Sequence, residues 1–94
     1  MRRPKQMYAK KAELARMFGV TPPTVYKRVA GIEAEIGKRY NQYAIIDDLI
    51  SVAVYADFEK YKKMLADKNL RKHVPLFNMD DAERYIDKMG VRWA

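Results

Sequence analysis

The spacing of apolar positions over residues 11–18 predicts a short amphipathic helix. Apolar residues recur there at the three- and four-residue intervals that place side chains on one face of a helix. Gly19 follows, and glycine can adopt the left-handed conformation that commonly ends a helix. We expect the inward face of this helix to consist of Ala12, Leu14, Ala15 and Phe18.

A second helix is predicted to begin after a short turn. Thr21 is a suitable N-cap, and Pro22 and Pro23 suit the first helical turn, where backbone N–H groups have no partner within the helix. Val25 and Val29 lie four residues apart and predict the buried stripe of this helix.

Together the two helices predict a helix-turn-helix, a unit that places its second helix in the major groove of DNA. Ala15 is small enough to let the helices cross closely, and apolar Val20 is expected to plug the turn. The polar side chains of the second helix are then expected to face outward, where they could contact base edges. These side chains belong to Thr24, Tyr26, Lys27 and Arg28.

The pattern after the second helix predicts a β-hairpin with a basic tip. The recognition helix is expected to stop at Ala30-Gly31, and residues 32–36 alternate between apolar and acidic side chains as a half-buried strand does. Residues 37–39 (Gly-Lys-Arg) indicate a tight turn, and residues 40–46 are rich in the aromatic and β-branched residues that favour strands. The alternative is that residues 32–36 continue the recognition helix.

Two further helices are predicted in the C-terminal half. Asp47 or Asp48 is expected to cap a helix that extends to about residue 68, and residues 69–77 form a connector because Pro75 blocks a helix. A final helix is expected between Asn78 as its N-cap and Gly90 as its C-cap. The first of these helices has a stripe that comprises Ile50, Val54, Phe58, Tyr61 and Leu65.

The predicted fold class is therefore mostly α with a small β-hairpin: a winged helix-turn-helix followed by one long helix and a short C-terminal helix. Residues 1–10 are expected to form a basic flexible arm, residues 11–68 the DNA-binding domain with its supporting long helix, and residues 69–94 a connector and short helix. The arm, which carries Arg2 and Arg3, either follows phosphates or enters a minor groove, or is a disordered terminus with affinity for any polyanion.

Positive charge is concentrated on the segment that carries the helix-turn-helix. Residues 1–40 contain ten Lys and Arg against three Glu, whereas residues 41–94 contain nine basic and nine acidic residues. The entire net charge of +7 therefore belongs to the first 40 residues. Neutralisation of phosphates is the usual reason for such a concentration, since a solubilising charge has no need to be segregated.

Several function classes are disfavoured by the residues present. The chain has no cysteine and a single histidine, His73, which excludes disulfides, thiolate chemistry and a histidine metal cluster. We expect no cofactor, no metal and no enzymatic activity, because no pair of side chains has the type and spacing for acid–base or nucleophilic chemistry. No signal peptide is recognisable, and the most apolar stretch, residues 43–58, is too short to span a membrane. A cytoplasmic, nucleoid-associated location is expected.

The order of motifs resembles the excisionase family of small winged-helix proteins, which is related to the MerR-type DNA-binding domain. The resemblance rests on AELARMFGV followed by TPPTVYKRV, then Gly31, the wing segment at residues 36–40, and residues 44–49. It covers about residues 11–50, and the rest of the chain is longer than the usual excisionase ending. The resemblance implies a protein that binds and bends DNA and so assists a tyrosine integrase in excision.

Candidate DNA contacts follow from these patterns and the resemblance. Lys27 or Arg28 would read guanine or contact phosphates, and Thr21 with the N–H groups at the start of its helix would bind a phosphate. Arg39 could instead pair with Glu33 or Glu35. The expected DNA-binding residues are Thr21, Thr24, Tyr26, Lys27, Arg28, Lys38, Arg39, Tyr40, Arg2 and Arg3.

Expected partners are double-stranded DNA, an integrase, and further copies of the chain as a homodimer or a cooperative multimer on DNA. A small transcriptional regulator of a phage or plasmid is a second interpretation, because the same binding near a promoter represses or activates. A third is a non-enzymatic interaction protein that oligomerises through its C-terminal helices, which offer apolar and aromatic surface beyond the wing.

Overall fold

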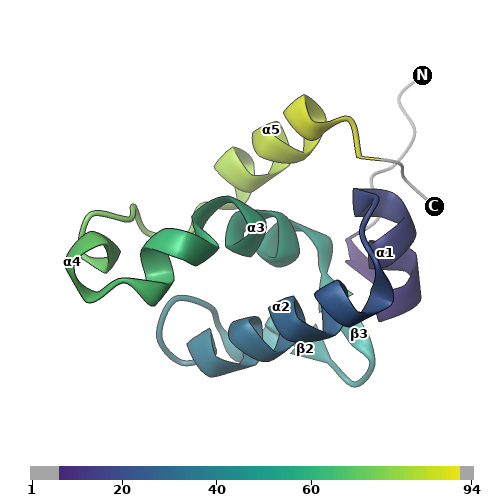
Figure 1. The fold of residues 1–94 in the computed structure, drawn as a ribbon, viewed down its shortest axis with the longest axis horizontal. Coiled ribbons are helices and arrows are strands. Elements are labelled where there is room, and N and C mark those ends of the chain that lie inside the picture. The colour runs from purple at the N-terminus through teal and green to yellow at the C-terminus, as the bar shows by residue number, and fades with distance from the viewer. Residues whose placement is uncertain (1–6, 92–94) are drawn as a thin grey trace.

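The computed structural model describes residues 7–91 and is mostly helical with one small antiparallel sheet, which confirms the predicted fold class. Its longest helix, α3, lies at the centre, with α2 on one side and α5 on the other (Figure 1). The elements are β1 (Tyr8–Ala9), α1 (Lys11–Phe18), α2 (Pro22–Glu35), the 3-10 helix η1 (Gln42–Ala44), β2 (Ile45–Ile46), β3 (Leu49–Ser51), α3 (Val52–Ala66), α4 (Lys68–Arg71) and α5 (Met79–Met89).

The hydrophobic core lies where α1, α2 and α5 meet α3. Tyr55 of α3 is completely buried, and its ring packs edge-on against Phe18 with the ring centroids 4.6 Å apart. Side chains from each surrounding element complete this core, so the C-terminal helix is part of the same packed body as the helix-turn-helix. The largest fully buried side chains, besides Tyr55, are Leu14, Ile32, Ile50, Ile86, Val25 and Val52.

The helix-turn-helix forms as predicted, but Ala12, predicted to face inward, is exposed, and Met17 is buried instead. Helix α1 ends at Gly19 in the left-handed conformation (φ 65°), and α2 begins at Pro22 with Thr21 as its N-cap. The N–H of Val20 donates to the carbonyl oxygen of Ala15 (3.0 Å), which closes the turn. Ala15 is buried where the helices cross, as its small side chain allows.

The prediction that the recognition helix stops at Ala30-Gly31 is wrong, and the alternative that residues 32–36 continue this helix is confirmed as far as Glu35. Gly31 is not a C-cap. A Cβ built on it would lie 3.0 Å from Cε1 of Phe58 and still closer to Cζ, so the missing side chain lets α2 approach α3. Ile32, predicted to lie in a strand, is a fully buried residue of this helix. The chain turns instead at Gly37, whose φ of 87° suits glycine.

The β-hairpin exists, but it lies further along the chain than predicted. Strand β2 pairs antiparallel with β3, with Ile45 opposite Ile50 and Ile46 opposite Leu49. Of the predicted strand at residues 40–46, only Ile45–Ile46 belongs to the sheet, because η1 occupies residues 42–44. The hairpin turn consists of Asp47 and Asp48, so its tip is acidic rather than basic.

A third strand comes from the segment predicted as a flexible arm. Strand β1 pairs antiparallel with β3, with Tyr8 opposite Ser51 and Ala9 opposite Ile50, and Ala9 is completely buried. The arm prediction is therefore wrong for Tyr8 and Ala9. Arg2 and Arg3 lie outside the described residues.

The helix caps of the C-terminal half are partly as predicted. Asn78 caps α5 by accepting the N–H of Asp81 (3.1 Å), and Gly90 ends it in the left-handed conformation (φ 68°). The cap of α3, however, is Ser51, whose Oγ accepts the N–H of Val54 (3.3 Å), whereas Asp47 and Asp48 form the hairpin turn.

The predicted connector also contains helix α4. Asp67 caps it by accepting the N–H groups of Asn69 (2.8 Å) and Leu70 (3.3 Å). Within residues 7–91, no helix has both the length and the apolar character needed to cross a membrane.

Candidate nucleic-acid interface

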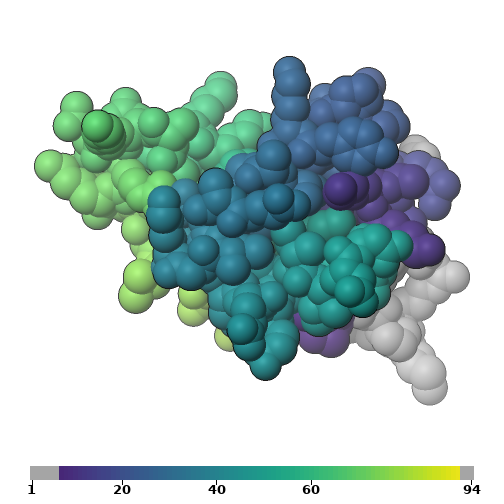
Figure 2. Space-filling view, turned by 90° about the horizontal axis from the view of Figure 1, so that it is seen from below, coloured from purple at the N-terminus to yellow at the C-terminus, as the bar shows by residue number. Residues whose placement is uncertain are grey.

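The outward face of α2 presents Pro23, Tyr26, Lys27 and Ala30, which lie three and four residues apart and are exposed. Tyr26 is 56% exposed, and the Lys11 ammonium lies 5.1 Å from its ring centroid, so a second cation from α1 joins this face. Figure 2 shows α2 (blue) on the molecular surface beside the β2–β3 hairpin (teal). The exposed positions predicted for Tyr26 and Lys27 are thus confirmed.

The start of α2 lacks the free N–H groups that the phosphate prediction requires. Pro22 and Pro23 have no N–H, and the N–H of Thr24 donates to the carbonyl oxygen of Thr21 (3.1 Å). The hydroxyl groups of Thr21 and Thr24 lie 2.9 Å apart and bond to each other. Thr21 is exposed and Thr24 is half-buried, so any contact to DNA from this end of α2 would come from these hydroxyl groups.

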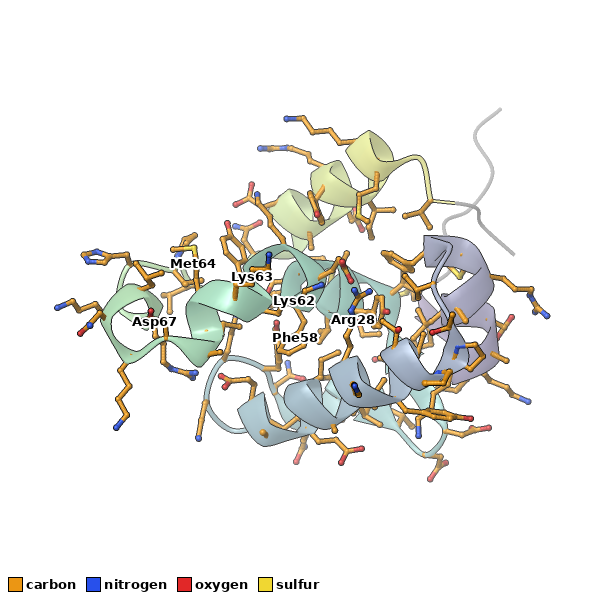
Figure 3. The ribbon with its side chains drawn as sticks, viewed as in Figure 1. Arg28, Phe58, Lys62, Lys63, Met64 and Asp67 are labelled. Carbon is orange, nitrogen blue, oxygen red and sulfur yellow. The ribbon has the colours of Figure 1, made fainter. Side chains whose placement is uncertain are left out.

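Arg28 points into the molecule, which contradicts its predicted outward position. Its guanidinium forms an ion pair with Glu59 of α3 and donates to the hydroxyl oxygen of Tyr55 (3.3 Å). Figure 3 shows Arg28 in the space between α2 and α3, near Phe58. Glu59 also pairs with Lys62 (3.1 Å), so its carboxylate has two cationic partners, Arg28 and Lys62.

Arg39, predicted to contact phosphates from the wing tip, is a buried structural residue. Its Nε and Nη2 donate to the two carboxylate oxygens of Asp57 at 2.7 and 2.9 Å, and its Nη1 donates to the carbonyl oxygen of Pro75 (2.5 Å). Only 7% of the Arg39 side chain and 6% of the Asp57 side chain are exposed. Burial disfavours the guanidinium cation, but the hydrogen bonds and charge of Asp57 outweigh it and raise the pKa of Arg39.

Tyr40 is buried in the same cluster and cannot contact a phosphate. Its hydroxyl donates to Oδ2 of Asp57 (2.7 Å), and its ring packs edge-on against Phe77 with centroids 5.5 Å apart. Burial, together with the hydrogen bond to Asp57 and the charge of Asp57, raises the pKa of Tyr40 far above its ordinary value. The prediction that Arg39 pairs with Glu33 or Glu35 is also wrong, since Asp57 is its partner.

Glu35 has a different partner, which the sequence did not indicate. Both Nη atoms of Arg71 donate to the carboxylate of Glu35, at 2.9 and 2.5 Å. Hydrogen bonding from Arg71 is the largest cause of a lowered pKa at Glu35, with burial opposing it and the charge of Arg71 adding to it. This pair connects the last turn of α2 to α4.

The acidic partners on α3, Asp57 and Glu59, were not predicted from the sequence, although the sequence contains a signal for Asp57. Asp57 lies three residues after Val54 and four before Tyr61, and so occupies the apolar stripe of α3. A carboxylate in such a stripe requires a buried cationic or hydrogen-bonding partner. The pattern could therefore have predicted a partner for Asp57, but not that Arg39 supplies it.

The cations that remain accessible around α1, α2 and the following turn, all exposed except the half-buried Lys11, define the candidate interface. Lys38 is exposed in the turn after α2, as predicted, and the basic residues of α1 and its N-cap were not among the predicted contacts. Two acidic features lie nearby: Glu33 on α2 and the hairpin turn of Asp47 and Asp48. The cationic members of the interface are Lys10, Lys11, Arg16, Lys27 and Lys38.

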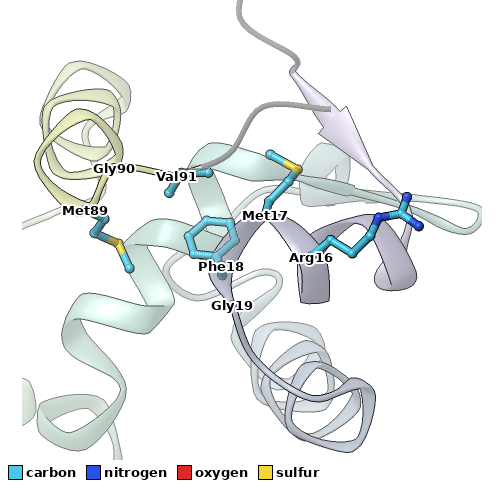
Figure 4. Close-up of a pocket in the computed structure, with 7 residues that line it drawn as sticks. All are labelled: Arg16, Met17, Phe18, Gly19, Met89, Gly90 and Val91. Atoms are coloured by element: carbon cyan, nitrogen blue, oxygen red, sulfur yellow. The ribbon is translucent and has the colours of Figure 1, made fainter.

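A separate pocket of about 370 Å³ lies where the C-terminal ends of α1 and α5 approach each other (Figure 4). Among the described residues that line it, Arg16 alone is ionisable, so residues 7–91 supply no pair of groups for acid–base chemistry there. Among residues 7–91, no three acidic or histidine side chains come together in a group that could hold a metal ion. The pocket is lined by Arg16, Met17, Phe18, Gly19, Met89, Gly90 and Val91.

Comparison of the chain with protein-family models, with curated proteins and with solved structures finds no match.

Proposed function

We propose that this protein binds double-stranded DNA with the exposed face of α2 in the major groove. Tyr26 and Lys27 are the central contacts, the hydroxyl of Thr21 assists at the start of the helix, and Lys11 and Lys38 neutralise phosphates on either side. Arg28, Arg39 and Tyr40 are excluded from this interface because α3 and its neighbours enclose them.

The observation that carries this proposal is the outward presentation of Lys27 and Tyr26 by the second helix of a helix-turn-helix. The turn at Gly19 is closed by a backbone hydrogen bond, and Val25 and Val29 bury the opposite face of α2. A rigid helix with exposed cationic and aromatic side chains suits the geometry and charge of a major groove.

Fluorescence anisotropy of a labelled random-sequence duplex at two salt concentrations tests this proposal. We expect binding that weakens steeply as salt rises, and Lys27→Ala should weaken it by about fivefold at low salt, since a lost contact of roughly 1 kcal/mol has that effect. Lys88→Ala on α5 removes the same charge from the opposite side of α3 and serves as the matched control. Equal effects of the two substitutions would refute the assigned interface.

The hairpin provides an independent test, because its acidic turn lies beside α2. If a duplex occupies this face, Asp47 and Asp48 face its phosphates and weaken binding. The variant Asp47→Asn/Asp48→Asn should therefore bind DNA several-fold more tightly than the native chain. Asparagine tolerates the left-handed conformation of Asp47 (φ 54°), so the turn should survive. Unchanged affinity would mean that the hairpin does not approach DNA.

The excisionase interpretation is the more specific form of this proposal. The resemblance supports it through the order of helix-turn-helix, hairpin and supporting helix. The acidic hairpin turn departs from the family, in which the wing carries glycine and basic or aromatic residues. A small transcriptional regulator would use the same interface. Selection of bound sequences from a random pool, followed by an excision assay with an integrase that uses the selected site, would separate the two functions.

Assembly through the C-terminal helices is a second candidate function. Leu76, in the connection between α4 and α5, is 92% exposed, and Leu70 and Met79 are 45% and 44% exposed. Such exposed apolar side chains favour contact with another protein surface. A stable oligomer in the absence of DNA is the expected result, and a monomeric light-scattering mass at high micromolar concentration would contradict it.

A further inference from the structure

The C-terminal half is neutral in sum, but its charge is segregated within it. Residues 60–73 contain six Lys and Arg against Asp67 alone. The remaining parts of the half, residues 41–59 and 74–94, contain three basic residues against eight acidic ones. A second basic segment therefore exists, separate from the helix-turn-helix, and the total charge of the half conceals it.

Three lysines of this segment are exposed and have no ion pair with any residue in the described ranges: Lys63, Lys68 and Lys72. We call them the distal basic surface. Lys63 lies near the end of α3, Lys68 begins α4, and Lys72 follows it.

The other cations of the segment are engaged within the fold. Lys62 pairs with Glu59, Arg71 pairs with Glu35, and Lys60 lies over the rings of Tyr61 and Tyr85 at 5.2 and 5.5 Å. The charge of the distal basic surface is thus left unbalanced by neighbouring carboxylates, apart from Asp67, whose side chain caps α4.

The distal basic surface is held in a defined position relative to α2. Arg71 donates to both carboxylate oxygens of Glu35 in the last turn of α2, and its Nη1 also donates to the carbonyl oxygen of Leu65 (3.1 Å). Lys68 begins the short helix that contains Arg71, and Lys72 follows it directly, so these contacts join the segment that carries both lysines to the C-terminal end of α2. Short helices are rarely stable alone, so this anchoring is what keeps the lysines in place.

The molecule is 42 Å long, and α1 and α4 lie toward opposite ends of it (Figure 1). Viewed from below, the segment that contains α4 (green) is visible next to α2 (blue), on the side away from α1 (Figure 2). With a rise of 3.4 Å per base pair, a duplex needs about 12 base pairs to extend over this length.

We propose that the distal basic surface binds phosphates of the same DNA duplex that α2 engages, so that the footprint extends beyond the helix-turn-helix toward α4. This inference rests on the proposed function. The lysines supply sequence-independent affinity, whereas α2 supplies the contacts to bases. These lysines have no ion pair within residues 7–91, and α4 is joined to the end of α2 through Arg71 and Glu35, so they could meet phosphates that flank the occupied groove.

The test compares two pairs of substitutions that remove equal charge. Lys68→Gln/Lys72→Gln alters the distal basic surface, and Arg84→Gln/Lys88→Gln alters exposed residues of α5. Anisotropy is measured as a function of salt with random-sequence duplexes of about 24 and about 10 base pairs, the shorter of which cannot extend over the whole length. Lys27→Ala is measured alongside.

On the longer duplex, Lys68→Gln/Lys72→Gln should reduce the slope of log K against log salt by about 1 to 2, since each phosphate contact contributes about 0.9. The same pair should have little effect on the shorter duplex, and the α5 pair little effect on either. Equal effects of the two pairs, or no effect of the distal pair, would overturn the inference.

The inference and the proposed function fail in different ways. Binding that Lys27→Ala weakens and the distal pair does not would leave the function of α2 in place and overturn the extended footprint. Binding that only the distal pair weakens would contradict the assignment of α2. Retention on a heparin column is measured for the same variants. If Lys68→Gln/Lys72→Gln loses heparin binding but binds the duplex unchanged, the lysines bind another polyanion, which also overturns the inference.

Discussion

The chain contains two Lys-Arg dipeptides, at residues 27–28 and 38–39. Their side chains have similar contacts but differ in how deeply the arginine is buried. In each the lysine is exposed and the arginine pairs with a carboxylate of α3. Arg28 pairs with Glu59 at the edge of the core, with 17% of its side chain exposed, whereas Arg39 pairs with Asp57 with only 7% exposed. Arg39 also reaches Pro75, so it holds the connector as well as the turn after α2.

The difference shows that neighbouring cations can have different surroundings. A guanidinium presents several donors in a fixed plane and suits a buried carboxylate, whereas a lysine ammonium is strongly hydrated and stays in water. Arg71 and Lys72 repeat the division, with Arg71 bonded to Glu35 and Lys72 exposed. We therefore expect Arg28, Arg39 and Arg71 to contribute to stability, and the neighbouring Lys27, Lys38 and Lys72 to contribute to binding.

The largest expected effect is that of Arg39→Ala. The substitution leaves the buried carboxylate of Asp57 without its cation, and breaking such a pair costs about 3–5 kcal/mol. Urea unfolding monitored by circular dichroism measures the loss. Lys38→Ala is the neighbouring control and should change stability by less than about 0.5 kcal/mol. Similar losses for both variants would show that burial does not separate the two residues.

Arg28→Ala should have a smaller effect, about 1.5–3 kcal/mol, as is typical for a hydrogen bond to a charged group. Its pair with Glu59 is more exposed than that of Arg39 with Asp57. The matched variant Lys27→Ala should weaken DNA binding with little change in the unfolding midpoint. If Arg28→Ala weakened binding while its midpoint stayed native, Arg28 would belong to the interface and the comparison would fail.

The smallest expected effect is a dependence of stability on pH through Glu35. Its pKa in the folded protein lies below the usual 4.5, chiefly because Arg71 donates hydrogen bonds to it. A carboxyl of this kind stabilises the fold above its unfolded pKa, and this contribution is lost as pH falls through the folded pKa. Glu35→Gln should therefore reduce the loss of thermal stability below pH 4.5.

Glu33→Gln provides the control for that measurement, because Glu33 is exposed on the same helix. Thermal midpoints of the native chain and both variants are measured between about pH 3 and pH 7. At the acidic end, the midpoint should fall less steeply for Glu35→Gln than for the native chain and Glu33→Gln. An identical pH dependence of the midpoint in the two variants would mean that the contact with Arg71 does not contribute to folding.

The elements that the sequence predicted correctly depend on local signals. Helix α1 with its end at Gly19, the start of α2, and α5 between Asn78 and Gly90 follow from periodicity and capping residues within a few positions of each other. Short-range geometry decides these features, so they can be identified without knowledge of distant residues.

The predictions that failed depend on distant residues. Gly31 has the local character of a helix stop, but Phe58 of α3 requires a residue without a side chain there, and α2 continues through it. The hairpin forms at residues 45–51 rather than 32–46 because β1, from near the N-terminus, supplies a neighbouring strand for β3. Residues near Gly31 do not indicate that Phe58 will pack there, and residues near β3 do not indicate that β1 will pair with it.

The sequence by itself determined the helical periodicity, the helix-turn-helix, the caps that depend on adjacent residues, and the concentration of positive charge. Only the tertiary structure decided which cations remain on the surface, because Arg28 and Arg39 face carboxylates on α3 and Arg71 faces one on α2. The physical reason is that a charge is stable away from water only beside an opposite charge. Which opposite charges come close is a property of how the helices pack.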